Sequence, residues 1–487
     1  MNKNTLCAGL LFLLLTVAPQ AFAEEVRQPI TINEAVHTAL ANNLNLRLQQ
    51  EEAARTLGAA LSEEGTFDPT LAAEAMNQEQ DTTPVFLGSS EQETNTEWNA
   101  RLSKRMTTGT ELDLSWQNRR LETDSLFYPI SPIYNSGLNF GVRQPLLQGL
   151  GSEVQTAGLE AARRQAEAAA FQVDNRAADL AAEVKNAYWE LVFAWQDIEV
   201  RKLALNLAEK LRDETKEMIE VGMLAAVEIY EPESEVALRE RQLIGGEWAI
   251  GLAEDELKLL LNTEDWNSTL DPEDRPRMVV SNPDFDQVLA NALANRADIK
   301  AADLQVEAAR LRMTVAKNRV LPSLDLEGGV GVGGTSDSYR NSLDNISSDP
   351  DTIWQVGIVF STPLGNNTAK GDYHQAKASL AKARTEAEFL RQQVRRSTRE
   401  VVRDVELAVK GVEAAEKTSL ATLKRLEAEQ EKFKVGRSTA NDVLEAQEAY
   451  AEAVSSENRV RVEYVKTLAE LDRIQGIIRF AANGPNP

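Results

Sequence analysis

The chain has few cysteine and histidine residues, which form disulfides and many metal centres. It contains one cysteine, Cys7, and two histidines, His37 and His374, which lie far apart in the sequence. Two isolated histidines are more simply interpreted as polar surface residues on helices than as metal ligands. The sequence therefore predicts no disulfide, no metal site and no bound cofactor.

Long hydrophobic runs are also missing, apart from one near the start. The apolar run Leu10–Ala18 is followed by a small-x-small site at Ala21–Ala23, so we expect a signal peptide over residues 1–23. Its cleavage would also remove Cys7. No later stretch approaches the ~20 apolar residues of a membrane helix, so any part that enters a membrane must consist of strands.

Positive charge is scarce as well. The 76 acidic residues outnumber the 52 basic ones, which argues against nucleic acid as a partner because that affinity depends on Lys and Arg. Gly329, Gly331 and Gly334 satisfy G-x-G-x-x-G, but we expect strand and polar loop after them rather than the helix that a dinucleotide site requires. With no catalytic constellation and no phosphate-binding loop, no enzymatic activity is predicted.

An internal repeat is the most informative feature that is present. Residues 35–46 (AVHTALANNLNL) resemble residues 288–299 (VLANALANRADI). Three further pairs of landmarks follow in the same order: Pro69 with Pro322, Pro145 with Pro363, and Gly222 with Gly436. The first prolines lie 27 residues after the matched asparagine in both copies, and the glycines lie 77 and 73 residues past the second prolines. The preserved order and spacing indicate a duplicated unit.

Each copy is predicted to run helix, strands, very long helix, turn, helix. Prolines in an acidic linker prevent a continuous helix between the copies. The expected boundaries are a signal peptide 1–23; a first repeat 24–261, with strands about 68–144, a long helix about 152–220 and a helix about 224–261; a linker 262–284; a second repeat 285–480, with strands about 322–362, a long helix about 368–434 and a helix about 437–478; and a tail 481–487.

The long helices have the period of a coiled coil. Apolar residues follow alternating steps of four and three from Val173 to Ile198 in the first copy, and from Ala376 to Val394 and again from Val401 to Val412 in the second. This is the spacing of a heptad seam. Each proline-free stretch of close to 70 residues would reach about 100 Å. An ordinary antiparallel coiled coil explains the periodicity equally well.

The strands alternate apolar with polar or small residues. The pattern covers Leu112–Trp116, Leu138–Val142, Leu324–Val332 and Trp354–Phe360. It is typical of strands with lipid on one side and water on the other, although a half-buried strand of a soluble sandwich shows the same alternation.

Strands in lipid must pair both edges, so they have to close into a barrel. One chain has too few strands to enclose water, and copies must therefore join. If each repeat gives one hairpin, three chains give about twelve strands, and threefold symmetry is an economical closure.

These pieces and several motifs resemble the TolC or outer-membrane efflux protein family. The resemblance extends from residue 31 to Ile478 and is most specific in QPLLQGLG (144–151), FKVGRSTANDVLEAQEAY (433–450) and MIEVGMLAAVEIY (218–230). It implies a mainly α fold with β, in which the chain is a two-repeat protomer of a trimeric transmembrane β-barrel continuous with a long periplasmic α-helical barrel. The implied partners are two further copies, a periplasmic membrane-fusion adaptor, an inner-membrane pump and outer-membrane lipid.

The implied function is a passive exit duct of a tripartite efflux or type I secretion system, located in the outer membrane and extending into the periplasm. The alternative is a soluble periplasmic coiled-coil adaptor or scaffold. Adaptors usually carry one helical hairpin, whereas this chain has two equivalent hairpins that alternate with amphipathic strands, which favours the duct. The sequence does not identify the transported substrate, the pump or the adaptor.

A periplasmic gate is predicted at acidic residues just past the second turn glycine. Asp442 and Glu445 lie on one helical face, and three copies would form two acidic rings that attract cations and raise some carboxyl pKa values. They match the family's acidic constriction, with Glu445 in place of the more usual aspartate. Glu228 and Glu231 are the first-copy equivalents, and Pro232 is expected to distort the helix there. Alternatively, these residues are solvated helix-start residues favoured by the helix dipole.

An adaptor-docking tip is predicted at Val221-Gly222 and Val435-Gly436. Glycine allows a tight turn, and the groove beside it would accept a partner's helical hairpin. A plain C-cap glycine explains the same residues. A basic residue in this turn often latches family members shut, but Arg437 is out of register with that latch by one position, so no salt bridge is predicted for it.

The first copy contains additional sequence. Its strand region, from proline to proline, has 76 residues against 41 in the second copy. The segment WNARLSKRMTTGTELDLSW (98–116) indicates a hairpin with its turn near Thr108-Gly109. This hairpin could add strands to the barrel, fold outward or extend a strand pair, and the sequence alone leaves these alternatives open.

Overall fold

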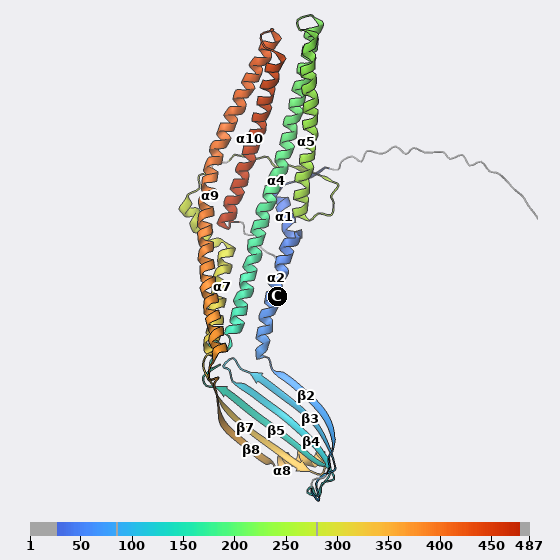
Figure 1. Ribbon diagram of the computed structural model, residues 1–487, viewed down its shortest axis with the longest axis vertical. Coiled ribbons are helices and arrows are strands. Elements are labelled where there is room, and N and C mark those ends of the chain that lie inside the picture. Colours follow the sequence, from blue (N-terminus) through green and yellow to red (C-terminus); the bar gives the residue numbers. More distant parts are fainter. Residues whose placement is uncertain (1–26, 84–85, 279–280, 478–487) are drawn as a thin grey trace, which may run out of the picture. The chain divides into compact units, whose positions relative to one another are not determined.

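The computed structural model describes residues 27–83, 86–278 and 281–477 (Figure 1), so the expected signal peptide and C-terminal tail lie outside the described residues. The chain forms two compact units, each assembled from three stretches of sequence. Unit 1 comprises the chain up to Ala39, Val184–Arg277 and Ala415–Val462, and unit 2 comprises Leu40–Glu183, Met278–Ala414 and the chain from Glu463. Within the described residues, no helix combines the length and apolarity of a membrane span.

Each repeat begins with two helices in succession. Helices α1 (Ile32–Asn42) and α2 (Leu44–Glu64) in the first copy correspond to α6 (Phe285–Asn295) and α7 (Ala297–Arg319) in the second. Asn43 starts α2 by accepting hydrogen bonds from the backbone N–H groups of the second and third residues that follow it. The sequence pattern does not indicate this break, which interrupts the continuous helix expected before each proline.

The long helices bury the predicted seam. They are α4 (Ala157–Glu220), which follows the short α3 (Ser152–Gln155), and α9 (Asn367–Lys434), with 64 and 68 residues. Leu180, Val184 and Leu191 of α4 and Val405 and Val412 of α9 are all fully buried. The returning helices are α5 (Tyr230–Leu261), preceded by the 3-10 turn η2 (Ala226–Ile229), and α10 (Ala440–Gln475).

Unit 2 contains a six-stranded antiparallel sheet. Its strands, in spatial order, are β2 (Thr70–Asp81), β3 (Gln92–Arg105), β4 (Glu111–Thr123), β5 (Ile133–Pro145), β7 (Ser323–Ser336) and β8 (Asp351–Ser361). The additional hairpin of the first copy is β3–β4, and it is inserted into the sheet between β2 and β5. Of the alternatives left open for this hairpin, the structure shows the one in which it adds strands to the sheet, so the first copy contributes four strands.

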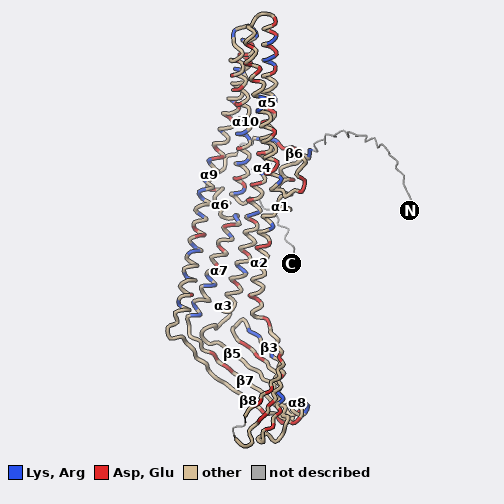
Figure 2. Tube along the Cα trace, turned by 45° about the vertical axis from the view of Figure 1, so that its right-hand side comes forward, with Lys and Arg blue, Asp and Glu red and all other residues tan. Residues whose placement is uncertain are grey.

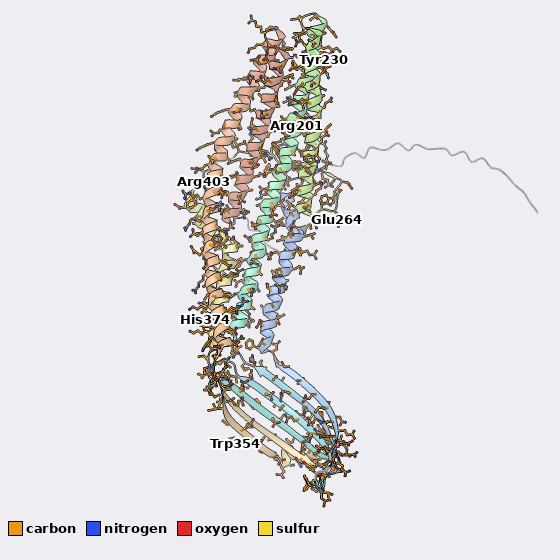
Figure 3. All side chains as sticks on the ribbon, viewed as in Figure 1. Arg201, Tyr230, Glu264, Trp354, His374 and Arg403 are labelled. Atoms are coloured by element: carbon orange, nitrogen blue, oxygen red, sulfur yellow. The ribbon has the colours of Figure 1, made fainter. Side chains whose placement is uncertain are left out.

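The two faces of the sheet differ in polarity. Cross-strand register places Trp116 opposite Leu138 and Leu114 opposite Phe140, so their side chains share one face. Apolar residues of this face are exposed in the single chain: Leu71, Leu102, Leu114, Trp116, Leu138, Phe140, Leu326, Val330, Trp354, Val356, Ile358 and Phe360. Trp354 on β8 is 74% exposed (Figure 3). The opposite face carries charged and amide side chains.

A short helix, α8 (Tyr339–Ser348), lies between β7 and β8 where a polar loop was expected. It packs against β7 and β5, with the Tyr339 ring centroid 5.3 Å from that of Trp98. A Cβ at Gly334 would overlap the Ser342 carbonyl oxygen. The glycine pattern in β7 thus makes room for this helix, and β7 itself pairs with antiparallel neighbours rather than opening a βαβ unit.

The linker between the repeats is anchored within unit 1. Its strand β6 (Thr269–Pro272) pairs in parallel with β1 (Arg27–Ile30). The fully buried Tyr188 of α4 holds this pair, because its hydroxyl lies 3.0 Å from the Ile30 carbonyl oxygen and 2.9 Å from Asp274 Oδ2. The prolines of the linker and its short strand β6 together explain why no helix continues through the linker.

Candidate gate and docking tip of the helical hairpins

The turns at the ends of α4 and α9 have the same backbone structure. Gly222 and Gly436 adopt φ values of 76° and 69°, which L side chains rarely adopt. The Gly222 N–H donates to the Ile219 carbonyl (3.0 Å) and the next N–H donates to the Met218 carbonyl (2.8 Å). The corresponding bonds at Gly436 measure 2.9 and 2.8 Å, so both helices end in a Schellman motif.

A hydrophobic cluster in unit 1 supports these turns. It combines Leu211 of α4 with residues of the second hairpin, including Leu426 and Phe433 of α9 and Val443 of α10, all almost completely buried. Met218 and Leu224, on either side of the first turn, pack against the same cluster. The two turns are therefore held on one shared core.

The predicted tip residues project from this core into solvent. Val221 and Val435 are 71% and 67% exposed, and neither contributes to the cluster beneath. The first turn carries further exposed apolar side chains, Met223, Val227 and Tyr230, the last of which lies near the outer end of α5 (Figure 3). The first tip is thus the more apolar of the two, a difference that sequence reasoning missed although all three residues are visible in the motif MIEVGMLAAVEIY.

Asp442 lies in the first turn of α10 and completes its N-terminal cap together with Thr439. Its Oδ2 accepts hydrogen bonds from the Thr439 N–H (2.9 Å) and hydroxyl (2.7 Å), while the Asp442 N–H donates to Thr439 Oγ1 (3.2 Å). This reciprocal pattern is a capping box. The backbone hydrogen bond from Thr439 is the main cause that lowers the pKa of Asp442 within one chain. Asp442 is therefore a helix-start residue here, and its membership of a gate ring stays a prediction.

Glu445 forms an ion pair across the hairpin. Its Oε1 lies 2.8 Å from Arg425 Nη2 of α9, and both side chains are more than half exposed. Sequence reasoning missed Arg425. The signal that could have found it is the turn itself, because positions 11 before and 9 after Gly436 face each other when two helices fold back at that glycine.

The first-copy acids are placed differently. Glu228 lies in η2 and Glu231 in the first turn of α5, and both are exposed without an ion-pair partner among the described residues. The expected helix distortion at Pro232 is wrong, because α5 begins at Tyr230. Proline is tolerated in the first turn, where backbone N–H groups have no intrahelical acceptor.

The turn of the second hairpin has its own polar contacts. Ser438 Oγ donates to Glu429 Oε2 at 2.9 Å. The ion pair with Lys432, followed by this bond, lowers the pKa of Glu429. Arg437, by contrast, is exposed and forms no ion pair with the described residues of its own chain. Basic and acidic residues alternate with uncharged ones along α9, as the coloured trace shows (Figure 2).

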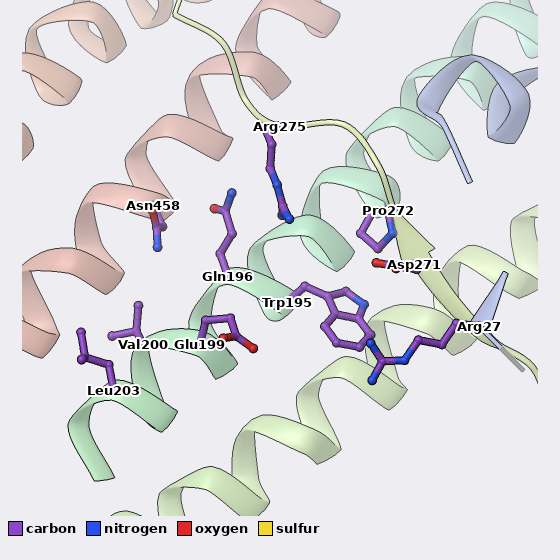
Figure 4. A pocket seen from close by; sticks show the side chains of 10 residues that line it. All are labelled: Arg27, Trp195, Gln196, Glu199, Val200, Leu203, Asp271, Pro272, Arg275 and Asn458. Atoms are coloured by element: carbon purple, nitrogen blue, oxygen red, sulfur yellow. The ribbon is translucent and has the colours of Figure 1, made fainter. Parts of the chain in front are cut away.

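A separate hollow of about 560 Å³ lies in unit 1 beside β1, β6 and α4 (Figure 4). Trp195 forms part of its wall and donates through Nε1 to the Leu270 carbonyl (3.1 Å), while the Arg27 guanidinium lies 5.3 Å from its ring centroid. Arg275 and Asp271 also line it. The mixed charge of this lining selects no particular ligand, and no motif in the sequence pointed to it.

This arrangement, two equivalent helical hairpins joined to an amphipathic antiparallel sheet, defines a class of outer-membrane channel. Residues 288–476 match the family model described as outer membrane efflux protein. The chain is 23% identical over 353 residues to the outer membrane protein TolC of Vibrio cholerae, an alignment that covers 72% of this chain and 78% of that protein.

Solved structures share the fold. The outer-membrane channel OprN superposes with a TM-score of 0.69 at 16% identity, covering 91% of this chain and 89% of its own. VceC from Vibrio cholerae gives 0.68 at 17% identity, covering 91% and 96%. The predicted fold class and the predicted resemblance to the TolC or outer-membrane efflux protein family are confirmed.

The function and location that these matches support are those of an outer-membrane efflux channel that extends into the periplasm, and the matched family comprises transport channels rather than enzymes. The alternative of a soluble periplasmic adaptor finds no support in these matches.

Proposed function

We propose that three copies of this chain form a closed passive duct, without enzymatic activity of its own, through the outer membrane. The observation that carries this proposal is the sheet. One face carries exposed apolar side chains on all six strands, and the end strands β2 and β8 each leave one edge unpaired among the described residues. Both features are costly in a single chain and are resolved when lipid covers the face and other copies pair the edges.

Three copies would contribute about eighteen strands, because each sheet has six. Barrels of this size leave an aqueous channel, whereas a barrel of about eight strands is filled by its own side chains. The additional hairpin β3–β4 therefore favours a wide opening. The polar face of the sheet would line it.

The gate of this duct is proposed at Asp442 and Glu445, with a lesser contribution from Glu228 and Glu231. Three copies would bring several carboxylates close together at the helix turns, where they would retain cations and narrow the passage. The capping role of Asp442 supports this proposal, because a helix-start carboxylate with fixed hydrogen bonds has a defined position.

The docking tip is proposed at Val221, Gly222, Val435 and Gly436. Exposed valines beside turns that share one rigid core are suited to receive a helical hairpin of a periplasmic adaptor, which would connect the duct to an inner-membrane pump. The pump would choose the substrate, since the duct offers only a polar lumen.

The experiment is mass determination of the detergent-solubilised protein, followed by conductance in planar bilayers. We expect a trimer and small, cation-preferring currents that increase when Asp442→Ala and Glu445→Ala are combined. The control, Glu51→Ala with Glu63→Ala, removes two exposed α2 carboxylates and should leave conductance unchanged. A stable monomer, or a bilayer that stays silent with every variant, would overturn the duct. Equal conductance of the gate variant and wild type would overturn the gate alone.

A further inference from the structure

The polar face of the sheet carries a continuous row of alternating charge. Cross-strand register places Arg105 of β3 opposite Glu111 of β4, Glu111 opposite Arg143 of β5, and Arg143 opposite Glu327 of β7. The row crosses four neighbouring strands near the end of the sheet, since β5 ends two residues after Arg143. Such a row requires that four strands from both repeats keep one register.

Arg143 is the centre of this row. Its Nη2 lies 2.9 Å from Asp325 Oδ2, its Nη1 3.5 Å from Glu111 Oε2, and its Nε 3.8 Å from Glu327 Oε1. One guanidinium therefore faces three carboxylates, each through a different nitrogen, which the planar fork of arginine permits and the single ammonium of lysine does not.

The three carboxylates depend unequally on Arg143. Glu111 has a second cation, because its Oε1 also accepts hydrogen bonds from Arg105 Nε (3.0 Å) and Nη2 (2.6 Å). Asp325, whose side chain is 5% exposed, has Ser323 Oγ at 2.7 Å, and no other cation contacts Asp325 or Glu327 among the described residues. Removing Arg143 would leave two carboxylates without a counter-ion and a third with only one.

Stability accounts for only part of the cluster. Arg143 stabilises the buried Asp325 carboxylate, whose side chain is 5% exposed. Its pairs with Glu111 and Glu327 join side chains that are 38–50% exposed, and ion pairs at that exposure contribute little to stability. Their charge nevertheless acts on whatever passes within about a Debye length of the wall, roughly 8 Å at physiological ionic strength. The cluster is therefore placed to act on permeating ions.

We propose that Arg143 determines the charge preference of the sheet end of the duct, by neutralising a carboxylate cluster on the water-facing wall. This inference rests on the proposed function, because it requires the polar face to line an aqueous lumen. In a threefold assembly, three Arg143 side chains would lie at one level of the lumen and would allow small inorganic anions to pass there. Cation selection would then be concentrated at the separate carboxylates of the hairpin turns.

The test is the reversal potential in a KCl gradient, recorded for Arg143→Gln in the wild-type background and in the Asp442→Ala/Glu445→Ala background. We expect the ratio of K⁺ to Cl⁻ permeability to rise about twofold or more, most clearly when the hairpin-turn carboxylates are absent. Glu327→Gln should shift the ratio in the opposite direction. Opposite shifts from two variants of one cluster cannot arise from a common folding defect.

The matched control is Arg120→Gln. Arg120 lies in the same sheet and pairs with Glu122 at 2.5 Å, but it shares the side of β4 that carries Trp116, opposite to the row. The Arg120→Gln substitution removes the same charge from the sheet and should leave the ratio of K⁺ to Cl⁻ permeability unchanged. If Arg143→Gln and Arg120→Gln give the same ratio, or if Arg143→Gln favours anions, the inference is wrong while the duct stands. If wild type and all variants fail to conduct, the proposed function itself fails.

Discussion

Arg425 and Glu445 join the two helices of the second hairpin by an ion pair of 2.8 Å between Nη2 and Oε1. Because both side chains are largely exposed, the pair should contribute only about 0.2–1 kcal/mol to stability. Its larger effect is on charge, since Arg425 neutralises a carboxylate that the proposed gate uses.

Arg425→Gln should therefore leave the melting temperature almost unchanged and increase the preference of the channel for cations. The measurement pairs thermal unfolding in detergent with single-channel reversal potentials. Arg384→Gln, an exposed arginine of the same helix, is the control and should alter neither. An unchanged reversal potential in Arg425→Gln would place Glu445 away from the ion path.

The capping box of α10 leads to a second expectation. Thr439→Ala removes the acceptor for the Asp442 N–H, and loss of an N-cap residue costs about 0.5–2 kcal/mol. We expect faster amide hydrogen exchange in the first turn of α10, measured by mass spectrometry. Thr439→Ser retains the hydroxyl and should exchange like wild type. Protection equal to wild type in the alanine variant would show that the cap does not hold this turn.

Acid should act on the same cap. The pKa of Asp442 is lowered by its hydrogen bonds, so the folded state favours the ionised carboxyl. A lowered folded pKa gives stability that is complete above the ordinary carboxyl pKa and is lost as pH falls through the lowered value. The protection of the α10 first turn against amide exchange, corrected for the intrinsic exchange rate at each pH, should therefore fall below about pH 4 in wild type and depend less on pH in Asp442→Asn.

Tyr188 should make the linker anchor sensitive to alkali. Burial is the main cause that raises its pKa above the ordinary value of 10.0. Above that value the unfolded tyrosine ionises while the folded one stays protonated, so stability falls as pH rises toward the folded pKa. The melting temperature of wild type should drop from about pH 9 to about pH 11 more steeply than that of Tyr188→Phe.

At neutral pH Tyr188→Phe should be less stable than wild type. Tyr188→Phe loses the contacts to Ile30 and Asp274, which should cost about 1 kcal/mol because the partners remain only partly exposed to water. Tyr450→Phe, a partly buried tyrosine of unit 1, serves as the control for aromatic substitution. Parallel pH profiles for Tyr188→Phe and wild type would rule out this role for the hydroxyl.

Gly109 should be intolerant of any side chain. It adopts φ of 91°, and a Cβ there would lie 2.6 Å from the Gly149 carbonyl oxygen and 2.9 Å from Gln155 Nε2. Gly109→Ala should therefore disrupt the β3–β4 turn where it meets the QPLLQGLG motif, and lower the yield of assembled protein. Gly58→Ala is the opposite control, because this α2 glycine has nothing within 4 Å of its Cβ position. It should stabilise the helix by about 0.5–1 kcal/mol. Equal yields would contradict the tight packing at Gly109.

The sequence predicted the long helices well because their pattern is local. A heptad seam repeats over many turns, and its members Leu180, Val184 and Val405 are buried as expected. The break after Asn42 was not predicted because one residue of extended backbone changes no periodicity. Helix α8 was missed for a different reason: most of its ten residues are polar, and only the space left by Gly334 reveals that it packs on the sheet.

The candidate sites also differ in how far the sequence predicts them. The capping box formed by Thr439 and Asp442 follows a short spacing that is visible in the sequence. The partners of Arg143 come from β4 and β7, which lie far apart in the chain, and their approach depends on register that only long-range pairing fixes. The sequence shows which charged residues such strands carry, but it does not show which of them become neighbours across the sheet.

The position of the β3–β4 hairpin between β2 and β5 also bears on how such channels diversify. A hairpin that enters an antiparallel sheet leaves it at the end where it began, so the segments before and after it keep their places. One inserted hairpin therefore adds two strands to the sheet and leaves β2 and β5 running in the directions that connect them to their own helices.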